Sequence, residues 1–164
     1  MKKIILISCL IVSSILIFYT CDKDKTDATS DSTLYKEITA TGYTYFKNGD
    51  ILPRIPESPH GAFKLRFNSI ALSALDNNGV FPEGASFPTG SILVKEVISN
   101  NNISLYAIMK KDPSNGNAGN GWVWAELNTD GSTAFSAGRK GNGCISCHSI
   151  SPNRDLTRTF NLHQ

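Results

Sequence analysis

The chain has 164 residues, of which 16 are lysine or arginine and 14 are aspartate or glutamate, and its formal net charge is +2. This length suits one folded domain once a targeting segment has been removed. A charge so close to neutral lacks the basic excess of nucleic-acid-binding proteins, so we expect no nucleic acid among its partners.

The first 20 residues have the features of an export signal. Two lysines precede an apolar stretch over residues 4–19, which is short for a membrane-spanning helix. Cys21 and a polar run follow, as in a lipoprotein-type signal peptide (residues 1–20) that leaves Cys21 as the lipidated first residue. The Phe-Tyr-Thr sequence before Cys21 departs from the usual pattern, so an ordinary cleaved signal and an uncleaved anchor stay open as alternatives. We expect an exported, membrane-anchored lipoprotein that faces the periplasm or the cell surface.

The next segment predicts a tether followed by one domain. Residues 21–33 are mostly Asp, Thr, Ser and Lys, a composition typical of a flexible linker. Residues 34–164 are expected to form a single domain that opens with a helix over residues 34–45. Residues 47–61 contain three prolines and two glycines, which predicts a loop.

The middle of the chain alternates between apolar and polar residues, and this period of two is typical of half-buried strands. Five strands are expected, over residues 62–67, 91–98, 103–110, 122–127 and 132–136. A short helix is expected over residues 68–78. The predicted fold class is α+β and mainly antiparallel β, with a sheet of about five strands, an N-terminal helix and a short helix near the C-terminus.

A C-x-x-C-H motif formed by Cys144, Cys147 and His148 ends sixteen residues before the C-terminus. In an exported protein, this motif indicates the attachment site of a c-type haem. Two cysteines on one helical turn can form thioethers to one porphyrin, and the following histidine can supply the proximal iron ligand. We therefore predict one covalent haem c per chain, held by these three residues on the short C-terminal helix.

Three other interpretations of the motif are open. A structural zinc site needs four ligands, and the chain has no second cysteine pair beside it. A redox-active disulfide usually belongs to a thioredoxin-like βαβ unit, whereas this motif follows a glycine-rich run over residues 137–143. A plain structural disulfide is the third alternative. The haem interpretation accounts for every cysteine, because Cys9 would leave with the signal and Cys21 would carry lipid.

The position of the motif disfavours the common electron-shuttle architecture. Small all-helical cytochromes c carry the motif near their start and a methionine ligand downstream. Here the methionines are Met1 and Met109, both upstream. Met109 is a candidate iron ligand, but an apolar core methionine is the simpler interpretation.

A late C-x-x-C-H motif behind an antiparallel sheet resembles the cytochrome P460 family, which includes the β-sheet cytochromes c′. The matching patches, which span roughly residues 58–160, are Ser58-Pro59-His60-Gly61, Phe67-Asn68, Phe87 to Glu96, Met109-Lys110, Gly121-Trp122, Cys144 to His148, Asp155 and Phe160. The resemblance implies that the haem lies against the sheet, with His148 as proximal ligand and no strong protein ligand on the distal side. It further implies that the distal site binds nitric oxide or carbon monoxide, or oxidises hydroxylamine.

The resemblance also suggests two catalytic candidates. Hydroxylamine-oxidising members carry a covalent link from a lysine to the porphyrin, and Lys95 has the matching place in its strand. Glu126 is a candidate proton acceptor, since a carboxylate in an apolar pocket can have a raised pKa. The alternative interpretations are a solvent-facing lysine and an exposed glutamate, and His60 is interpreted as a turn or packing residue.

We therefore expect an exported c-type haem protein with His-ligated, five-coordinate iron that binds or oxidises small nitrogen species such as nitric oxide or hydroxylamine. If it is an enzyme, it is a hydroxylamine or N-oxide oxidoreductase. The alternative is a periplasmic electron-transfer cytochrome with no substrate chemistry of its own. The expected partners are a small nitrogen-containing ligand or gas, a redox partner protein and a lipid bilayer, and homodimers are usual among the relatives.

Overall fold

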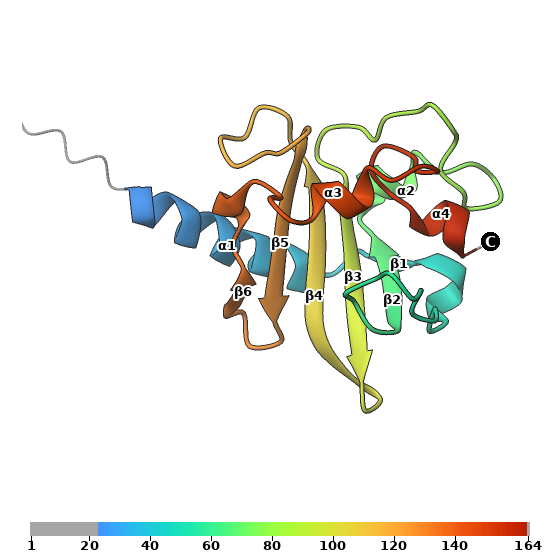
Figure 1. The fold of residues 1–164 in the computed structure, drawn as a ribbon, viewed down its shortest axis with the longest axis horizontal. Helices are drawn as coiled ribbons and strands as arrows, with labels where there is room; N and C mark the ends of the chain where they lie inside the picture. The colour runs from blue at the N-terminus through green and yellow to red at the C-terminus, as the bar shows by residue number, and fades with distance from the viewer. Residues whose placement is uncertain (1–22, 164) are drawn as a thin grey trace, which may run out of the picture.

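Within residues 23–163, consecutive strands pair side by side in one antiparallel sheet of six, in the order β1 to β6. The structure is a computed structural model that describes residues 23–163. The strands are β1 (Thr44–Tyr45), β2 (Phe63–Phe67), β3 (Ile92–Ser99), β4 (Asn102–Lys111), β5 (Trp122–Asn128) and β6 (Thr133–Phe135). Figure 1 shows the strands running up and down beside one another in chain order.

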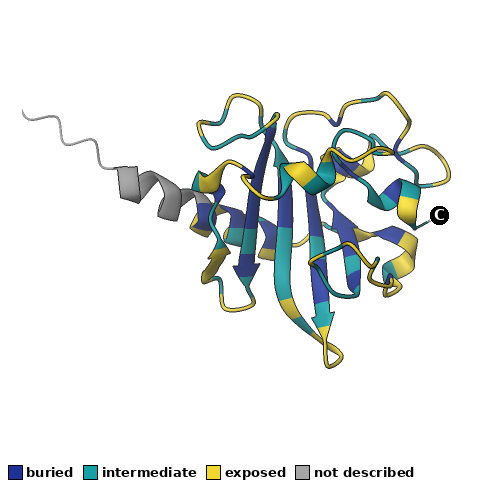
Figure 2. Ribbon diagram, viewed as in Figure 1, coloured by how far each residue is buried: buried dark blue, intermediate teal, exposed yellow. Residues whose placement is uncertain are grey.

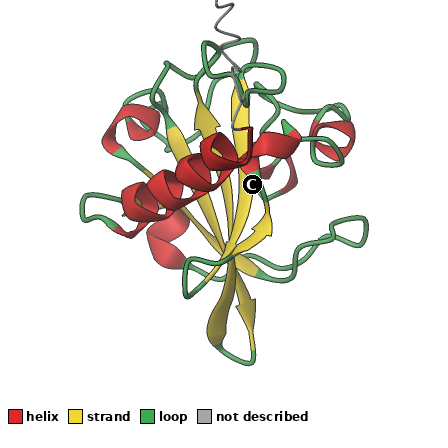
Figure 3. Ribbon diagram, turned by 90° about the vertical axis from the view of Figure 1, so that its left-hand side faces the viewer, coloured by secondary structure: helices red, strands yellow, loops and turns green. Residues whose placement is uncertain are grey.

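Helical segments lie on both faces of this sheet. They are α1 (Lys23–Thr39), α2 (Ser69–Leu72), α3 (Ile145–His148) and α4 (Thr159–Leu162), with 3-10 turns η1 (Phe46–Gly49) and η2 (Ala137–Arg139). The long α1 passes behind the sheet in Figure 1, whereas α3 and α4 lie in front of it. Figure 3, turned by 90°, shows α1 running obliquely across the strands.

Each face of the sheet has its own apolar core, because successive strand residues point to opposite sides. On the α1 face, Leu34 and Ile38 pack with Val94, Ile108 and Val123. The other face carries an aromatic cluster that consists of Phe46, Phe63, Phe67, Phe81, Phe87, Trp122, Trp124 and Phe160. The strands β3 and β5 are buried along most of their length (Figure 2), as expected for strands covered on both sides.

The predicted fold class is confirmed, and β1 is an addition to the five predicted strands. Residues 44 and 45 were expected at the end of a helix. Instead α1 ends at Thr39, and Gly42 turns the chain with a φ of +96° that favours glycine. Thr44 and Tyr45 then pair with Phe67 and Arg66 of β2.

The segment expected as a flexible tether, residues 21–33, differs from its prediction because α1 begins at Lys23. The carboxylate of Asp31 accepts hydrogen bonds from the Ala137 backbone N–H at 2.8 Å and from the Thr133 hydroxyl at 3.1 Å. These bonds fix the end of the segment, at Asp31, to η2 and β6.

The predicted signal peptide and Cys21 lie outside the described residues. Among residues 23–163, no helix has the length and apolar character needed to cross a membrane.

The predicted loop over residues 47–61 and the predicted helix over residues 68–78 are both present, and the helix is shorter than expected. The loop over residues 47–61 is largely irregular, and Leu52 within it pairs with Phe63 at the start of β2. The helix expected over residues 68–78 is reduced to α2. The side chain of Asn68 caps it by accepting a hydrogen bond from the Ala71 N–H at 2.9 Å.

Candidate haem pocket

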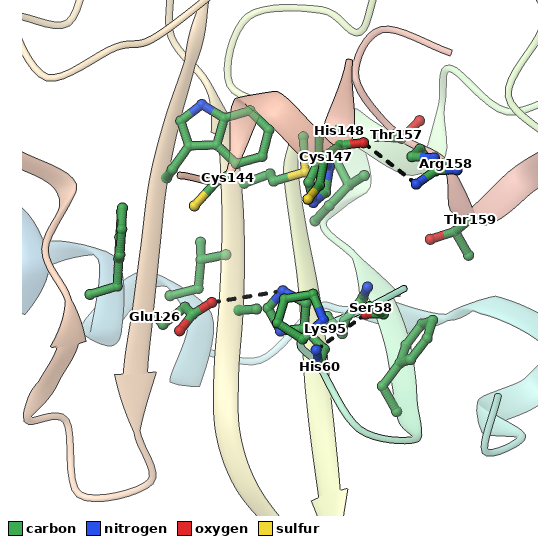
Figure 4. A pocket seen from close by; sticks show the side chains of 18 of the residues that line it. Ser58, His60, Lys95, Glu126, Cys144, Cys147, His148, Thr157, Arg158 and Thr159 are labelled. Atoms are coloured by element: carbon green, nitrogen blue, oxygen red, sulfur yellow. Dashed lines mark hydrogen bonds and ion pairs between the residues drawn. The ribbon is translucent and has the colours of Figure 1, made fainter. Parts of the chain in front are cut away.

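A cavity of about 370 Å³ lies between the sheet and the C-terminal segment. Its sheet side includes one row of cross-strand neighbours, in which Leu65, Lys95, Ala107 and Glu126 follow one another across β2 to β5. The opposite wall includes Cys144, Cys147 and His148. Figure 4 shows these three residues on one side of the pocket, with Lys95 and Glu126 on the other.

The C-x-x-C-H motif is brought onto the sheet by close glycine contacts. Gly141 has a φ of +70°, and a Cβ there would come within 2.5 Å of the Trp124 ring. A Cβ on Gly119 would overlap the Lys140 carbonyl oxygen. The turn before α3 can therefore approach β5 only because these two positions lack side chains.

Both cysteines of the motif are free thiols that line the cavity. Burial raises the pKa of Cys144 to about 11, so this thiol stays protonated at neutral pH. The two thiols lie at the two ends of one helical turn, which is the arrangement predicted for attachment to a single porphyrin.

One ring nitrogen of His148, Nδ1, is hydrogen-bonded to the backbone. This nitrogen lies 2.7 Å from the carbonyl oxygen of Leu156, and a carbonyl can only accept a hydrogen bond. The Trp124 ring packs edge-on against the imidazole with centroids 4.9 Å apart. Burial lowers the pKa of His148 to about 4, so the ring is neutral at pH 7. A neutral ring that donates through Nδ1 has its lone pair on Nε2, the atom available to a metal.

Lys95 faces the cavity from β3, and the solvent-facing interpretation of this residue is wrong. Its Nζ lies 4.1 Å from the centroid of the Phe63 ring. Burial lowers the pKa of the Lys95 ammonium from its usual 10.5 to about 8, while the charge of Glu126 acts in the opposite direction. The sheet face is covered by the 54–62 loop and the C-terminal segment, which strand periodicity alone does not reveal.

Glu126 also faces the cavity, and its carboxyl group is only partly exposed. Burial raises the pKa of Glu126, and the charge of Lys95 opposes that rise. The exposed-strand interpretation of Glu126 is therefore wrong as well, because the residue belongs to the row of side chains that lines the pocket.

His60 is one of the pocket residues that sequence reasoning missed. Its backbone N–H donates to the Ser58 hydroxyl at 3.2 Å, which is the expected turn, but its ring points into the cavity (Figure 4). The Nε2 atom lies 3.7 Å from Glu126 Oε1. The sequence held a signal for this placement. His60 is near the end of the loop that leads into β2, so it must lie close to the start of that strand.

The part of the chain that forms this pocket is similar to a known protein family. The family model described as Cytochrome P460 matches residues 54–159. The chain belongs to the cytochrome P460 family. A search of curated proteins found no match. Membership of the cytochrome P460 family makes the chain a haem protein, and the matched residues include every pocket residue discussed above.

The residues of the pocket fit the haem c of the cytochrome P460 family. The cavity volume falls in the range of roughly 300–1,000 Å³ that is usual for small-molecule and cofactor sites. Two thiols and one imidazole with a free Nε2 line the same cavity, and Phe63, Leu65 and Leu93 supply apolar surface. Met109 also lines it but is buried in the apolar core that contains the aromatic cluster, in agreement with its predicted packing role.

The zinc interpretation of the motif finds no support in the described residues. Over residues 23–163, no three or more His, Cys, Asp and Glu side chains are grouped so that they could hold a metal ion. The cytochrome P460 assignment rests on the family match over residues 54–159.

Proposed function

We propose that the protein is an exported c-type haem protein whose iron has His148 as its one protein ligand and binds and oxidises a small nitrogen species, with hydroxylamine as the favoured substrate. The observation that carries this proposal is the group of three ionisable side chains, Lys95, Glu126 and His60, in the same cavity as the C-x-x-C-H motif. A carrier of electrons alone has no need of a proton acceptor in such a cavity.

Haem, once attached, supplies the iron site for the substrate nitrogen and accepts the electrons of the oxidation. Cys144 and Cys147 hold it through their sulfurs, and His148 provides Nε2. The Leu156 carbonyl keeps the His148 ring in the orientation and tautomer that this role requires.

Glu126 is the residue proposed to remove a proton from hydroxylamine. The raised pKa makes its carboxylate a stronger base than an exposed glutamate carboxylate. The neighbouring His60 ring is neutral, because burial lowers its pKa to about 4, and its Nε2 lies 3.7 Å from the Glu126 carboxylate.

Lys95 is proposed to carry the covalent link to the porphyrin that the family resemblance implies. Only a neutral amine is nucleophilic, and a pKa of about 8 leaves about a tenth of the amine neutral at pH 7. An exposed lysine would have only about one part in 3,000 in that form. Burial beside an apolar wall therefore supports Lys95 as the linking residue.

An absorption experiment tests the proposal. The full chain is matured in a host that assembles c-type cytochromes, and its spectrum is recorded with and without hydroxylamine or nitric oxide. We expect haem that survives denaturation, spectral changes with both ligands and a red-shifted ferrous Soret band that Lys95→Met abolishes. A low-spin spectrum that neither ligand changes would instead favour the electron-transfer alternative and overturn the proposal.

The location of the protein is a separate part of the proposal and depends on residues 1–21. A lipidated Cys21 would hold the domain at a membrane surface, facing the periplasm or the cell exterior. We expect the wild-type protein in the membrane fraction and Cys21→Ala in the soluble exported fraction. Recovery of both proteins in the soluble fraction would contradict lipid anchoring without affecting the haem assignment.

A further inference from the structure

Lys111 and Asp155 form an ion pair beside the candidate haem pocket. The Lys111 Nζ lies 2.8 Å from Asp155 Oδ1 and 2.9 Å from Oδ2, and each side chain is only 11% exposed. Lys111 is the last residue of β4, whereas Asp155 belongs to the loop between α3 and α4. The pair therefore joins the sheet directly to the segment that follows the C-x-x-C-H motif.

The Asp155 carboxylate is held by further contacts. Its Oδ2 accepts a hydrogen bond from the Phe87 backbone N–H at 2.8 Å, and the Trp122 Nε1 lies 3.4 Å from Oδ1. The Lys111 ammonium also lies 4.9 Å from the Trp122 ring centroid. A carboxylate with this many partners fixes the position of its own backbone.

That backbone has an unusual conformation. Asp155 has a φ of +50° and Leu156 a φ of +66°, both in the left-handed region. Aspartate tolerates this region, but leucine does so only where surrounding contacts maintain it. The Leu156 N–H donates to Asn153 Oδ1 at 3.1 Å, and the Leu156 carbonyl oxygen accepts the His148 Nδ1 hydrogen at 2.7 Å. The strained turn thus carries the acceptor of the histidine proton.

We propose that Lys111 and Asp155 are positioning residues for the proximal ligand: their ion pair holds the 155–156 turn so that the Leu156 carbonyl stays bonded to His148 Nδ1. This inference rests on the proposed function, since it takes His148 as the iron ligand. A hydrogen bond at Nδ1 increases the donor strength of Nε2, and such contacts tune the reduction potential of a haem. The ion pair therefore sets the strength of the bond from His148 to iron.

The test compares two variants of the matured holoprotein with the wild type. Asp155→Asn keeps the side-chain size and an acceptor for the Phe87 N–H but removes the charge that binds Lys111. We expect a downshift of the ferrous iron–histidine stretching band in resonance Raman spectra, together with a higher reduction potential. Lys111→Gln breaks the same pair from its other side and should move both quantities in the same direction, which keeps the test usable if one variant fails to fold.

Glu37→Gln is the matched control. Glu37 pairs with Lys110 at 2.8 Å, and Lys110 is the neighbour of Lys111 on the opposite face of β4. This control loses a similar ion pair without touching the 155–156 turn, so its stretching band and potential should equal those of the wild type.

Two results would count against the inference in different ways. A haem-loaded Asp155→Asn or Lys111→Gln protein with reduced thermal stability but unchanged band and potential would show that the pair only stabilises the fold. That result overturns the inference and leaves the proposed function intact. A wild-type protein without attached haem would overturn both, because His148 would then have no iron to ligate.

Discussion

His60 Nε2 and Glu126 Oε1 face each other across 3.7 Å inside the pocket, from a loop and a strand that are 66 positions apart in the chain. Burial lowers the pKa of His60 to about 4 and raises that of Glu126. At neutral pH the histidine is therefore uncharged, and the contact is a polar one between a neutral ring and a carboxylate. The pair places a carboxylate and a neutral imidazole side by side in the cavity.

Replacing Glu126 with Gln should reduce hydroxylamine oxidation by about 10²–10⁴-fold, the usual contribution of a positioned general base. Haem attachment and the ferrous spectrum should be unchanged. Steady-state kinetics against a redox dye measure the effect. Glu57→Gln is the control, because Glu57 also borders the cavity but is exposed to solvent. Equal losses in both variants would contradict a specific role for Glu126.

The pH dependence of the same reaction follows from the raised pKa of Glu126. A base must be deprotonated to act, so the rate should fall as the pH drops through the pKa of this carboxyl group. That fall should occur above pH 4.5, the usual value for glutamate. We expect the acid limb of the kcat/KM profile to disappear in Glu126→Gln, and an unchanged limb would assign it to another group.

In a Lys95→Met background, which lacks the proposed lysine link, changing both Cys144 and Cys147 to Ala should abolish covalent haem, whereas His148→Ala should retain it with an altered iron spectrum. The thioethers and the iron ligand come from different residues, so the two effects are separable. Haem staining after denaturing electrophoresis and absorption spectra check them. His163→Ala, which also changes a ring that borders the cavity, should leave both properties intact. Stained haem in the double cysteine variant would be decisive against the assignment.

Lys95→Met should stabilise the haem-free chain at neutral pH by up to about 3 kcal/mol, the equivalent of a shift from 10.5 to about 8. A lysine with a lowered folded pKa binds fewer protons in the folded state than in the unfolded state between these values. The stability of the wild type relative to Lys95→Met should therefore rise from pH 8 to pH 10.5, because the other titrating groups are common to both proteins. Urea unfolding at several pH values measures both trends, and parallel pH curves for the two proteins would refute the assignment.

Gly141→Ala should destabilise the protein by about 2–4 kcal/mol, since it adds a clash with Trp124 to the strain of a positive φ. The yield of attached haem should fall with it. Gly143→Ala is the comparison, because Gly143 has a φ of +101° but has open space around its missing Cβ. Thermal unfolding should show a clearly smaller loss for Gly143→Ala, and equal losses would exclude the Trp124 contact as the cause.

Much of the sheet could be predicted from the sequence, because a strand with one face on a core leaves a period of two. Strands β2 to β6 begin and end within one residue of their predicted bounds. The short strand β1 was missed because two residues carry no detectable period. The length of α1 was missed because the bonds of Asp31 to Thr133 and Ala137 join segments far apart in the chain.

The candidate site divides in the same way. Cys144, Cys147 and His148 are adjacent in the chain, and their chemistry can be inferred from spacing alone. The environments of Lys95 and Glu126 could not, since strand alternation assigns each residue a face but not what covers it. The same holds for His60, whose ring is directed by the path of its loop across the sheet.

In the described part of the chain every strand pairs with its sequence neighbour, and the sheet that they form lies within residues 44–135, ahead of the motif. Such local pairing favours rapid assembly of the sheet on its own. We therefore expect the pocket face of the sheet to form before the last 30 or so residues fold over it. The thiols of Cys144 and Cys147 would remain accessible for haem attachment until the C-terminal segment packs against the sheet. Haem attachment would then be the last step of folding.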